Sequence, residues 1–374
     1  MKKLFALLLA LAMVLSMTAC GGGRIEAAAP AEKPAEAAPA AEAAPAAEAT
    51  GIEAGATIGV SLPWLGTQNW KEAEEMFKTE LEAAGFKPLI QAADNKVPQQ
   101  QQIESMIQNG AKVIVVGPID GTQLGAVLEE AKAAGVYVIG YDRLLENTTG
   151  VDGVVQFGSV KTGELQAQAL LDGLKEMKGE GPWNIELFGG GPADPNAPNF
   201  FKGAMSVLEP LIADGTLTVV SGQMDFTQCA TQDWDNSKAQ ARMDSLLSGF
   251  YSDKEIHGVL SPNDGIARAI ITSCEQAGQE IPAISGLDAE NESVEWVWAG
   301  RQYSTVAKPT DALVAQTIEI IKSLQAGNGL PEGTVAVNNG KIDVAVYELP
   351  PVVVTKDNAK EVFANDPGRM ELLK

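Results

Sequence analysis

Histidine is almost absent from this chain of 374 residues, because His257 is the only one. A single imidazole excludes a histidine-rich metal site and any proton relay that needs two histidines. The three cysteines, Cys20, Cys229 and Cys274, are too few and too widely spaced for a zinc site or a disulfide scaffold. Cys229 and Cys274 are equally compatible with free thiols and with a disulfide. We expect no bound metal ion and no cofactor.

Basic residues are also scarce, with 27 Lys and Arg against 49 Asp and Glu, for a net charge of −22. No local basic stripe offsets this excess, so we expect no binding to nucleic acid, which such a chain repels. Aromatic residues make up only 6% of the chain, while the apolar share of 45% is ordinary for a globular protein. The length suggests two or three domains.

The N-terminus has the features of an export signal. Two lysines precede an apolar run at residues 4–17, which is too short to span a bilayer comfortably. The small residues before Cys20 resemble a bacterial lipobox, with Met17 at a position where Leu is usual. We predict a lipoprotein signal peptide over residues 1–19 and a membrane anchor through lipidation of Cys20. Ordinary secretion is the alternative.

A region of low complexity follows the signal. Residues 24–55 are mainly Ala, Pro and Glu, with no aromatic residue to start a core and with prolines that interrupt any helix. We predict a lipid-anchored tether over residues 20–55 that lets a folded body stand away from the membrane.

From Ala56 onward, short apolar runs rich in β-branched residues alternate with longer stretches of helical periodicity. Strands that are apolar throughout are typical of a parallel sheet covered by helices on both faces. About ten such units are too many for one small sheet, so we predict an α/β fold with two doubly wound lobes. The predicted strands are 56–62, 87–93, 112–117, 136–141, 153–157, 183–189, 217–222, 256–261, 282–287 and 303–307, and the predicted helices lie near 69–84, 98–109, 121–134, 160–177, 198–213, 236–249, 264–278 and 310–326.

Polar side chains follow several of these strands directly. Asp142-Arg143, Asn263-Asp264, Asp288 and Lys308 all come just after the C-terminal end of a predicted strand. Ligands of open α/β sheets bind outside the carboxyl ends of the strands. If the two lobes face each other at these edges, the side chains meet in a cleft that can close on a ligand.

Several further short motifs occur along the chain, in the same order and at the same spacing as in a known family. They are IGYDRL at 139–144, NIELFGG at 184–190, GAMSVL at 203–208, AQARMDSLL at 239–247, GVLSPNDG at 258–265, ISGLDAE at 284–290, QYST at 302–305 and AKP at 307–309. In these motifs the chain resembles the periplasmic sugar-binding proteins of ABC importers, among them the D-xylose-binding and multiple-sugar-binding receptors. The resemblance covers most of residues 56–365.

The resemblance implies two Rossmann-like lobes joined by three crossovers, with sugar bound in the hinge cleft. It implies an N-terminal lobe of residues 56–157 plus 310–345 and a C-terminal lobe of 158–309 plus 346–370. It further implies that the closed form docks on a membrane permease driven by a separate ATPase. We accordingly expect an extracytoplasmic, lipid-anchored, monomeric receptor that captures a pentose or hexose and has no catalytic residue.

The residues expected to contact sugar follow from the chemistry of their side chains and from the family resemblance. Sugar hydroxyls need donors and acceptors such as carboxylates and amides, and the C–H faces of the ring suit aromatic side chains. Trp64 lies in a loop-like stretch with Pro63 and Gly66, which favours the cleft, whereas Trp70 is expected in the core. The resemblance implies most of the other contacts. The full set expected to bind ligand is Trp64, Asn69, Asp142, Arg143, Asn196, Trp234, Asn263, Asp288 and Lys308.

Four positions depart from the family pattern. Asn69 stands where close relatives have a basic residue, Gly158 and Ser159 stand where they have Asp-Asn, and Leu287 stands where they have Gln. At least three polar partners are lost or weakened, so the sequence does not name the sugar.

Two other functions fit parts of the sequence. A nucleoside or autoinducer receptor on the same fold could stack its ligand between Trp64 and Trp234. A secreted glycosidase could use two carboxylates such as Asp142 and Asp288, but that class rarely has a two-lobed, doubly wound body. We therefore favour the sugar receptor.

Overall fold

The computed structural model of the protein describes residues 51–374. The predicted signal peptide, the lipidation site at Cys20 and the tether up to residue 50 lie outside the described residues. Within the predicted tether, Ile52 is buried, and its N–H donates to the carbonyl of Leu324 at 3.2 Å. The tether predicted to extend to residue 55 is therefore too long, because the chain already packs on the folded body at Ile52. Over residues 51–374, no helix is long and apolar enough to cross a membrane.

The first lobe is built on a seven-stranded sheet in which only β11 runs antiparallel to its neighbour. Its inner strands are mostly buried, and β3, with the sequence VIVV, consists of buried β-branched residues. In sheet order the strands are β11 (Val335–Asn338), β12 (Asp343–Leu349), β5 (Gly153–Phe157), β4 (Tyr137–Tyr141), β3 (Val113–Val116), β1 (Thr57–Pro63) and β2 (Lys87–Ala93). β12 carries the first sheet past residue 345, where we expected this lobe to end.

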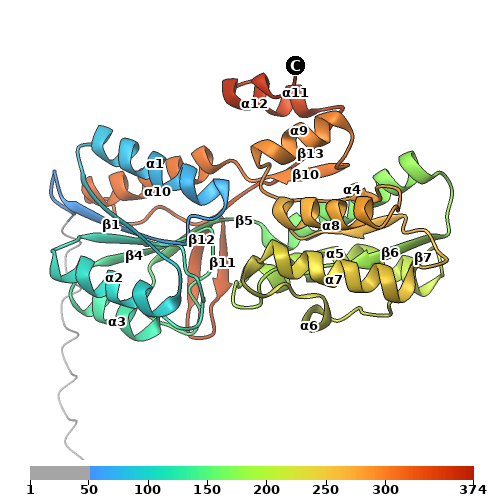
Figure 1. The fold of residues 1–374 in the computed structure, drawn as a ribbon. Coiled ribbons are helices and arrows are strands. Elements are labelled where there is room, and N and C mark those ends of the chain that lie inside the picture. The colour runs from blue at the N-terminus through green and yellow to red at the C-terminus, as the bar shows by residue number, and fades with distance from the viewer. Residues whose placement is uncertain (1–50) are drawn as a thin grey trace, which may run out of the picture. The chain divides into compact units, whose positions relative to one another are not determined.

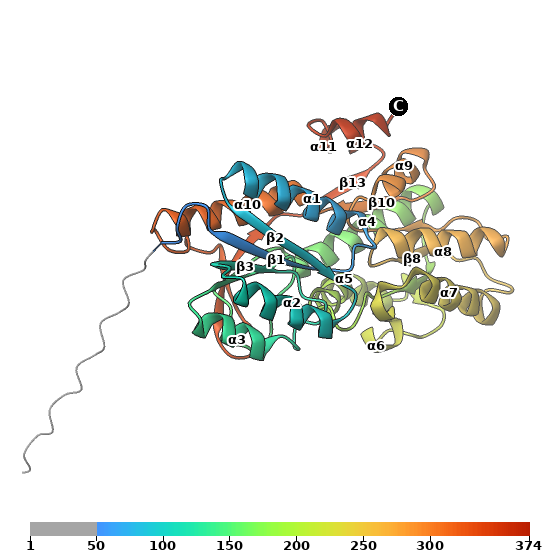
Figure 2. The ribbon, with the colours of Figure 1, turned by 60° about the vertical axis from the view of Figure 1, so that its left-hand side comes forward.

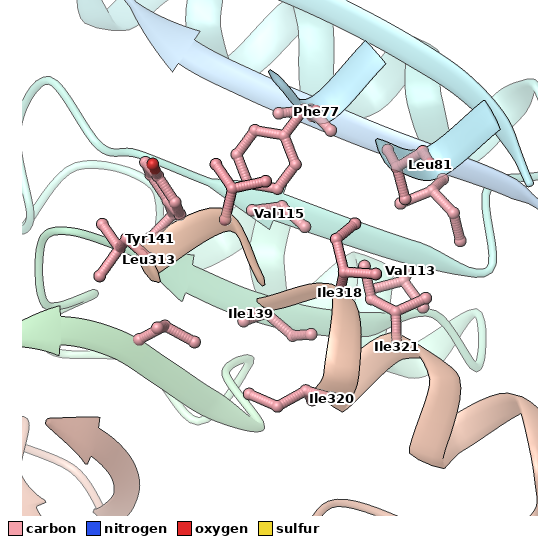
Figure 3. Packing of buried hydrophobic residues seen from close by; sticks show 14 of the residues in the cluster. Phe77, Leu81, Val113, Val115, Ile139, Tyr141, Leu313, Ile318, Ile320 and Ile321 are labelled. Carbon is pink, nitrogen blue, oxygen red and sulfur yellow. The ribbon is translucent and has the colours of Figure 1, made fainter. Parts of the chain in front are cut away.

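Helices cover both faces of this sheet, as Figure 1 shows. α1 (Gln68–Ala83) and α10 (Thr310–Gln325) lie on one face, and α2 (Lys96–Gln108) and α3 (Gly125–Ala133) lie on the other. The core under α1 and α10 contains Phe77 packed edge-on against Tyr141, with ring centroids 5.0 Å apart (Figure 3). This core fixes the strand end that leads directly into Asp142.

The second lobe is built on a four-stranded parallel sheet in the order β7-β6-β8-β9. One hydrophobic cluster joins this sheet to α4 and α5, and another joins it to α7 and α8. The strands are β6 (Trp183–Leu187), β7 (Leu217–Val219), β8 (Gly258–Leu260) and β9 (Ala283–Ile284), and the helices are α4 (Ser159–Lys178), α5 (Asn196–Ala213), α6 (Phe226–Cys229), η1 (Gln232–Trp234), α7 (Asn236–Phe250) and α8 (Asp264–Gln276).

A small antiparallel pair, β10 (Ser304–Ala307) with β13 (Val352–Thr355), lies where the chain passes between the lobes. The chain crosses after β5, after β10 and between β12 and β13. The first and third crossings touch, because the N–H of Gly158 donates to the carbonyl of Leu349 at 3.4 Å. α9 (Asn291–Ala299), α11 (Ala359–Val362) and α12 (Pro367–Glu371) pack beside this pair (Figure 2).

The predicted α/β fold with two doubly wound lobes and three crossings is confirmed. Every predicted strand and helix is present; β2 and β5 have the predicted bounds, and the ends of the others are shifted by a few residues. No pattern in the sequence predicted β11, β12, β13 or the short helices α6, η1, α9, α11 and α12. Most of these are short or lie in the segment after residue 330, where the regular alternation of strand and helix ends.

Candidate functional site

One cavity lies between the carboxyl ends of the parallel strands of the two sheets. It holds about 430 Å³ of space free of atoms, part of which is open to solvent. All the side chains that the sequence analysis expected to bind ligand line it. They are Trp64, Asn69, Asp142, Arg143, Asn196, Trp234, Asn263, Asp288 and Lys308. Both lobes contribute, since β1 and β4 end here from the first sheet and β6, β8 and β9 end here from the second.

A buried cation joins two carboxylates at the centre of this cavity. The ammonium of Lys308 lies 3.1 Å from Oδ1 of Asp142 and 3.3 Å from Oδ1 of Asp288. The three side chains are between 8% and 12% exposed. Burial opposes the charge on Lys308, but the two carboxylates outweigh it and raise the pKa of the lysine. Asp142 follows β4 and Lys308 follows β10, so this contact links the first lobe to the second.

Arg143 is held from both lobes. Its Nη1 donates to the carbonyl of Pro118 at 2.9 Å, and its Nη2 pairs with Oδ2 of Asp194 at 2.9 Å. The guanidinium also lies 5.3 Å from the centre of the Trp70 ring. Its buried Nε has no hydrogen-bond partner among the described residues. Burial raises the pKa of the Asp194 carboxyl, although the nearby guanidinium acts in the opposite direction.

The oxygen and the nitrogen of the Asn263 side-chain amide have different roles. It is the N-cap of α8, where its Oδ1 accepts a hydrogen bond from the N–H of Ile266 at 3.0 Å. This leaves the Nδ2 group free to donate toward the cavity that the residue lines.

Asp264 is fully buried behind Asn263, where it accepts hydrogen bonds from Nε2 of Gln302 and from the backbone of Glu290. Burial, with the Glu290 carboxylate nearby, raises the pKa of Asp264 to about 8. Asp264 is therefore part of the support behind the cavity.

The two indoles rest on glycines. A Cβ on Gly190 would lie 2.2 Å from the ring of Trp234, and a Cβ on Gly66 would lie 0.9 Å from the ring of Trp64. Only glycine allows either ring to lie so close to the backbone. Trp64 is 42% exposed at the cavity, while Trp234 is half-buried, and its Nε1 has no partner among residues 51–374. The glycine run after β6 thus forms a seat for an aromatic ring.

Asn196 contacts both the first lobe and a crossing. Its Nδ2 donates to the backbone carbonyl of Asp142 at 2.8 Å, and its Oδ1 accepts from the hydroxyl of Ser159 at 2.9 Å. One N–H and one lone pair of the amide remain for a ligand. At the other rim, Asn69 accepts a hydrogen bond from the hydroxyl of Thr67.

Several residues that line the cavity were not predicted from the sequence. Asp194 follows β6 by several residues, and Thr67 precedes α1, so neither comes directly after a strand. Trp70 is buried in the core as expected, but it also lines the cavity. Leu287, noted as a departure from the family pattern, forms an apolar wall with Phe200. Asp194 had one available signal, its position two residues before Asn196 at the start of α5.

The remaining reactive groups lie outside the cavity. Cys229 and Cys274 are both buried free thiols, which settles the choice left open by the sequence. His257 accepts a hydrogen bond at Nδ1 from the backbone of Asn184 at 2.8 Å, a structural role. Over the part of the chain that the structure describes, no group of three or more His, Cys, Asp or Glu side chains could hold a metal ion.

Comparison with known proteins shows the family to which the chain belongs. Residues 58–329 match the family described as a periplasmic binding protein domain. The chain is 42% identical to the multiple sugar-binding periplasmic receptor ChvE of Rhizobium radiobacter, over 82% of this chain and 89% of the receptor. It is 34% identical to the D-xylose-binding periplasmic protein of Escherichia coli K12, over 83% and 89% of the two chains.

A solved structure with a related sequence has the same fold. An ABC transporter solute-binding protein from Clostridium phytofermentans, crystallised with bound β-D-glucose, superposes with a TM-score of 0.80. The two sequences are 33% identical, and the match covers 85% of this chain and all of that chain. The resemblance seen in the sequence motifs is thereby confirmed.

Proposed function

Because this chain belongs to the periplasmic binding protein family, we propose that it is the substrate-binding component of an ABC importer and captures one monosaccharide between its lobes. One observation carries the proposal. Carboxylates, amides, cations and indoles from both sheets converge on a single cavity at the facing strand ends. Such a mixture of aromatic faces and convergent polar groups suits a polyhydroxylated ring.

The polar groups of the cavity match what a sugar offers. Asp142 and Asp288 accept hydrogen bonds from hydroxyls, and Arg143 and Asn263 donate to them. A buried N–H without a partner costs about 1–3 kcal/mol, so a sugar oxygen that accepts from Nε of Arg143 or Nε1 of Trp234 removes that penalty. The indole faces of Trp64 and Trp234 supply the apolar surface for C–H groups. Asn69, Asn196 and Lys308 complete the set.

The ligand closes the cleft by bridging the lobes. Asp142 and Arg143 belong to the first lobe, while Asn263 and Asp288 belong to the second, so one sugar that contacts all of them favours the closed arrangement. The three crossings supply the hinge. The closed form then presents both lobes to a membrane permease, whose ATPase drives transport.

The proposal extends to the cellular location and the oligomeric state of the protein. We infer a monomeric, extracytoplasmic lipoprotein, attached to the membrane through Cys20 and a tether. We also infer that the protein is not a glycosidase, because the two carboxylates best placed for such chemistry share the ammonium of Lys308. The departures at Asn69, Ser159 and Leu287 support a ligand with a hydroxyl pattern different from that of a simple pentose.

Isothermal titration calorimetry with D-xylose, D-glucose, D-galactose and adenosine tests the proposal. In calorimetry we expect saturable binding of at least one sugar, with one site per chain, and no binding of adenosine. In a separate absorbance assay we expect no release of nitrophenol from aryl glycosides. The substitution Asp142→Asn is compatible with the positive φ of 63° at this position. It should weaken sugar binding about 10- to 100-fold, which is the scale of one charged hydrogen bond. Asp253→Asn, an exposed acid away from the cavity, is the matched control. Binding of adenosine alone would favour a nucleoside receptor, and nitrophenol release would favour an enzyme.

A further inference from the structure

Asp194 is the buried charge of the cavity that the function proposed above does not use. Its side chain is 5% exposed, and it lies in the loop between β6 and α5 of the second lobe. It makes two contacts in opposite directions. Oδ2 pairs with Nη2 of Arg143 in the first lobe at 2.9 Å, and Oδ1 accepts from the backbone N–H of Asn196 in its own lobe at 2.9 Å.

The start of α5, directly after this loop, makes a second link to the first lobe. Asn196 donates from Nδ2 to the backbone carbonyl of Asp142 at 2.8 Å, next to the arginine that Asp194 holds. Ser159, at the first crossing of the hinge, donates to Oδ1 of Asn196 at 2.9 Å and fixes the orientation of the amide. Ser159, Asn196 and Asp142 are each less than 10% exposed. A hinge residue, a loop of one lobe and a strand end of the other are thus joined in one buried network.

This arrangement has an energetic consequence for the guanidinium. Three of its neighbours, the Pro118 carbonyl, the Asp194 carboxylate and the Trp70 ring, fix its plane. The contact with Asp194 exists only while the lobes touch, since the two residues belong to different lobes. When the lobes separate, Arg143 loses its charged partner, and Nε is no longer held in place for a sugar oxygen.

We propose that Asp194 is a positioning residue that latches the lobes together and holds Arg143 in its sugar-binding orientation, with Ser159 supporting the latch through Asn196. The latch slows ligand release without being the main contact to sugar. This inference rests on the proposed function, and it predicts an effect on dissociation, because the network forms only after the lobes have closed.

Stopped-flow kinetics with D-glucose and D-xylose on the full chain test the latch. Asp194→Asn keeps the size of the side chain and an acceptor for the Asn196 N–H, but it removes the charge that pairs with Arg143. We expect dissociation to accelerate about 30-fold, as for the loss of a buried charged hydrogen bond, with association changed less than about 3-fold. Ser159→Ala should accelerate dissociation about 5-fold. Glu255→Gln, which removes a partner of Lys178 at 2.8 Å within the second lobe, should change neither rate.

Small-angle X-ray scattering and thermal melting separate a latch from a merely structural role. A latch predicts that Asp194→Asn shifts the sugar-free protein toward a larger radius of gyration. If Asp194→Asn lowers only the melting temperature, while dissociation and scattering stay as in the unmodified protein, the inference is wrong. If that variant does not fold, Ser159→Ala decides, and unchanged dissociation overturns the latch. If the unmodified protein binds neither sugar, the proposed function is wrong. That result is distinct from a failure of the latch, in which the unmodified protein binds sugar and the variants release it at the same rate.

Discussion

The ammonium of Lys308 is the most consequential single group in the cavity, and its removal gives the sharpest test of the site. Lys308→Met keeps the length and the apolar stem of the side chain but leaves Asp142 and Asp288 facing each other without a cation. At separations of 3.1 and 3.3 Å, each ion pair contributes about 5 kcal/mol of Coulomb attraction at an effective dielectric constant of about 20. Desolvation offsets much of this, so the net loss of stability should be about 3–5 kcal/mol.

The loss should depend on pH in a defined direction. Burial raises the pKa of the Asp288 carboxyl, and Lys308 acts against this shift, so removal of the lysine should raise that pKa further. A carboxyl whose folded-state pKa is raised costs stability once the pH exceeds its unfolded value of about 3.9. This cost fades as the pH falls toward that value. The variant should therefore lose more stability at pH 7.5 than at pH 5.

Urea unfolding followed by tryptophan fluorescence at pH 5 and pH 7.5 measures both effects. Lys322→Met is the matched control, because Lys322 is 47% exposed and, within residues 51–374, pairs only with Glu319 on its own helix. An exposed pair of this kind contributes less than about 1 kcal/mol, without a change over this pH range. Equal destabilisation by the two substitutions, or a loss for Lys308→Met that is the same at both pH values, would refute the reasoning.

Three further predictions concern the walls of the cavity and the buried residue behind them. Gly190→Ala should weaken sugar binding more than about 10-fold in calorimetry, because the new Cβ would displace the ring of Trp234, whereas Gly249→Ala, with nothing within 4 Å, should leave affinity unchanged. Asn263→Ala should cost about 1 kcal/mol of stability and most of the affinity, and Asn263→Ser should restore the helix cap and the stability but not the binding; recovery of affinity by serine would contradict a role for the amide. Asp264→Asn should gain stability relative to the unmodified protein as the pH rises from 5 to 8, since a folded-state pKa of about 8 makes the buried acid costly to ionise, and parallel pH profiles of urea midpoints would count against this.

The sequence carried the architecture because its signals are local. Buried β-branched strands such as β3 are visible as short apolar runs, and amphipathic helices such as α1 are visible as helical periodicity. Their boundaries follow from Gly, Pro, Asn and Asp. The C-terminal strands β12 and β13 were missed because their burial pattern is irregular and their partners lie far back in the chain, at β5 and β10. Pairing of that kind is decided by the return of the chain through the hinge.

The sequence by itself also determined that several polar residues meet at the cavity. Parallel strands end at one edge of a sheet, so Asp142, Asn263 and Asp288, each just after a strand, had to gather at the rims of the lobes. Only the tertiary structure decided their partners. Lys308 lies 166 positions from Asp142 in the chain, and Asp194 meets Arg143 only across the cleft. Such contacts depend on how three crossings orient one lobe against the other, and no local pattern in the chain encodes that orientation.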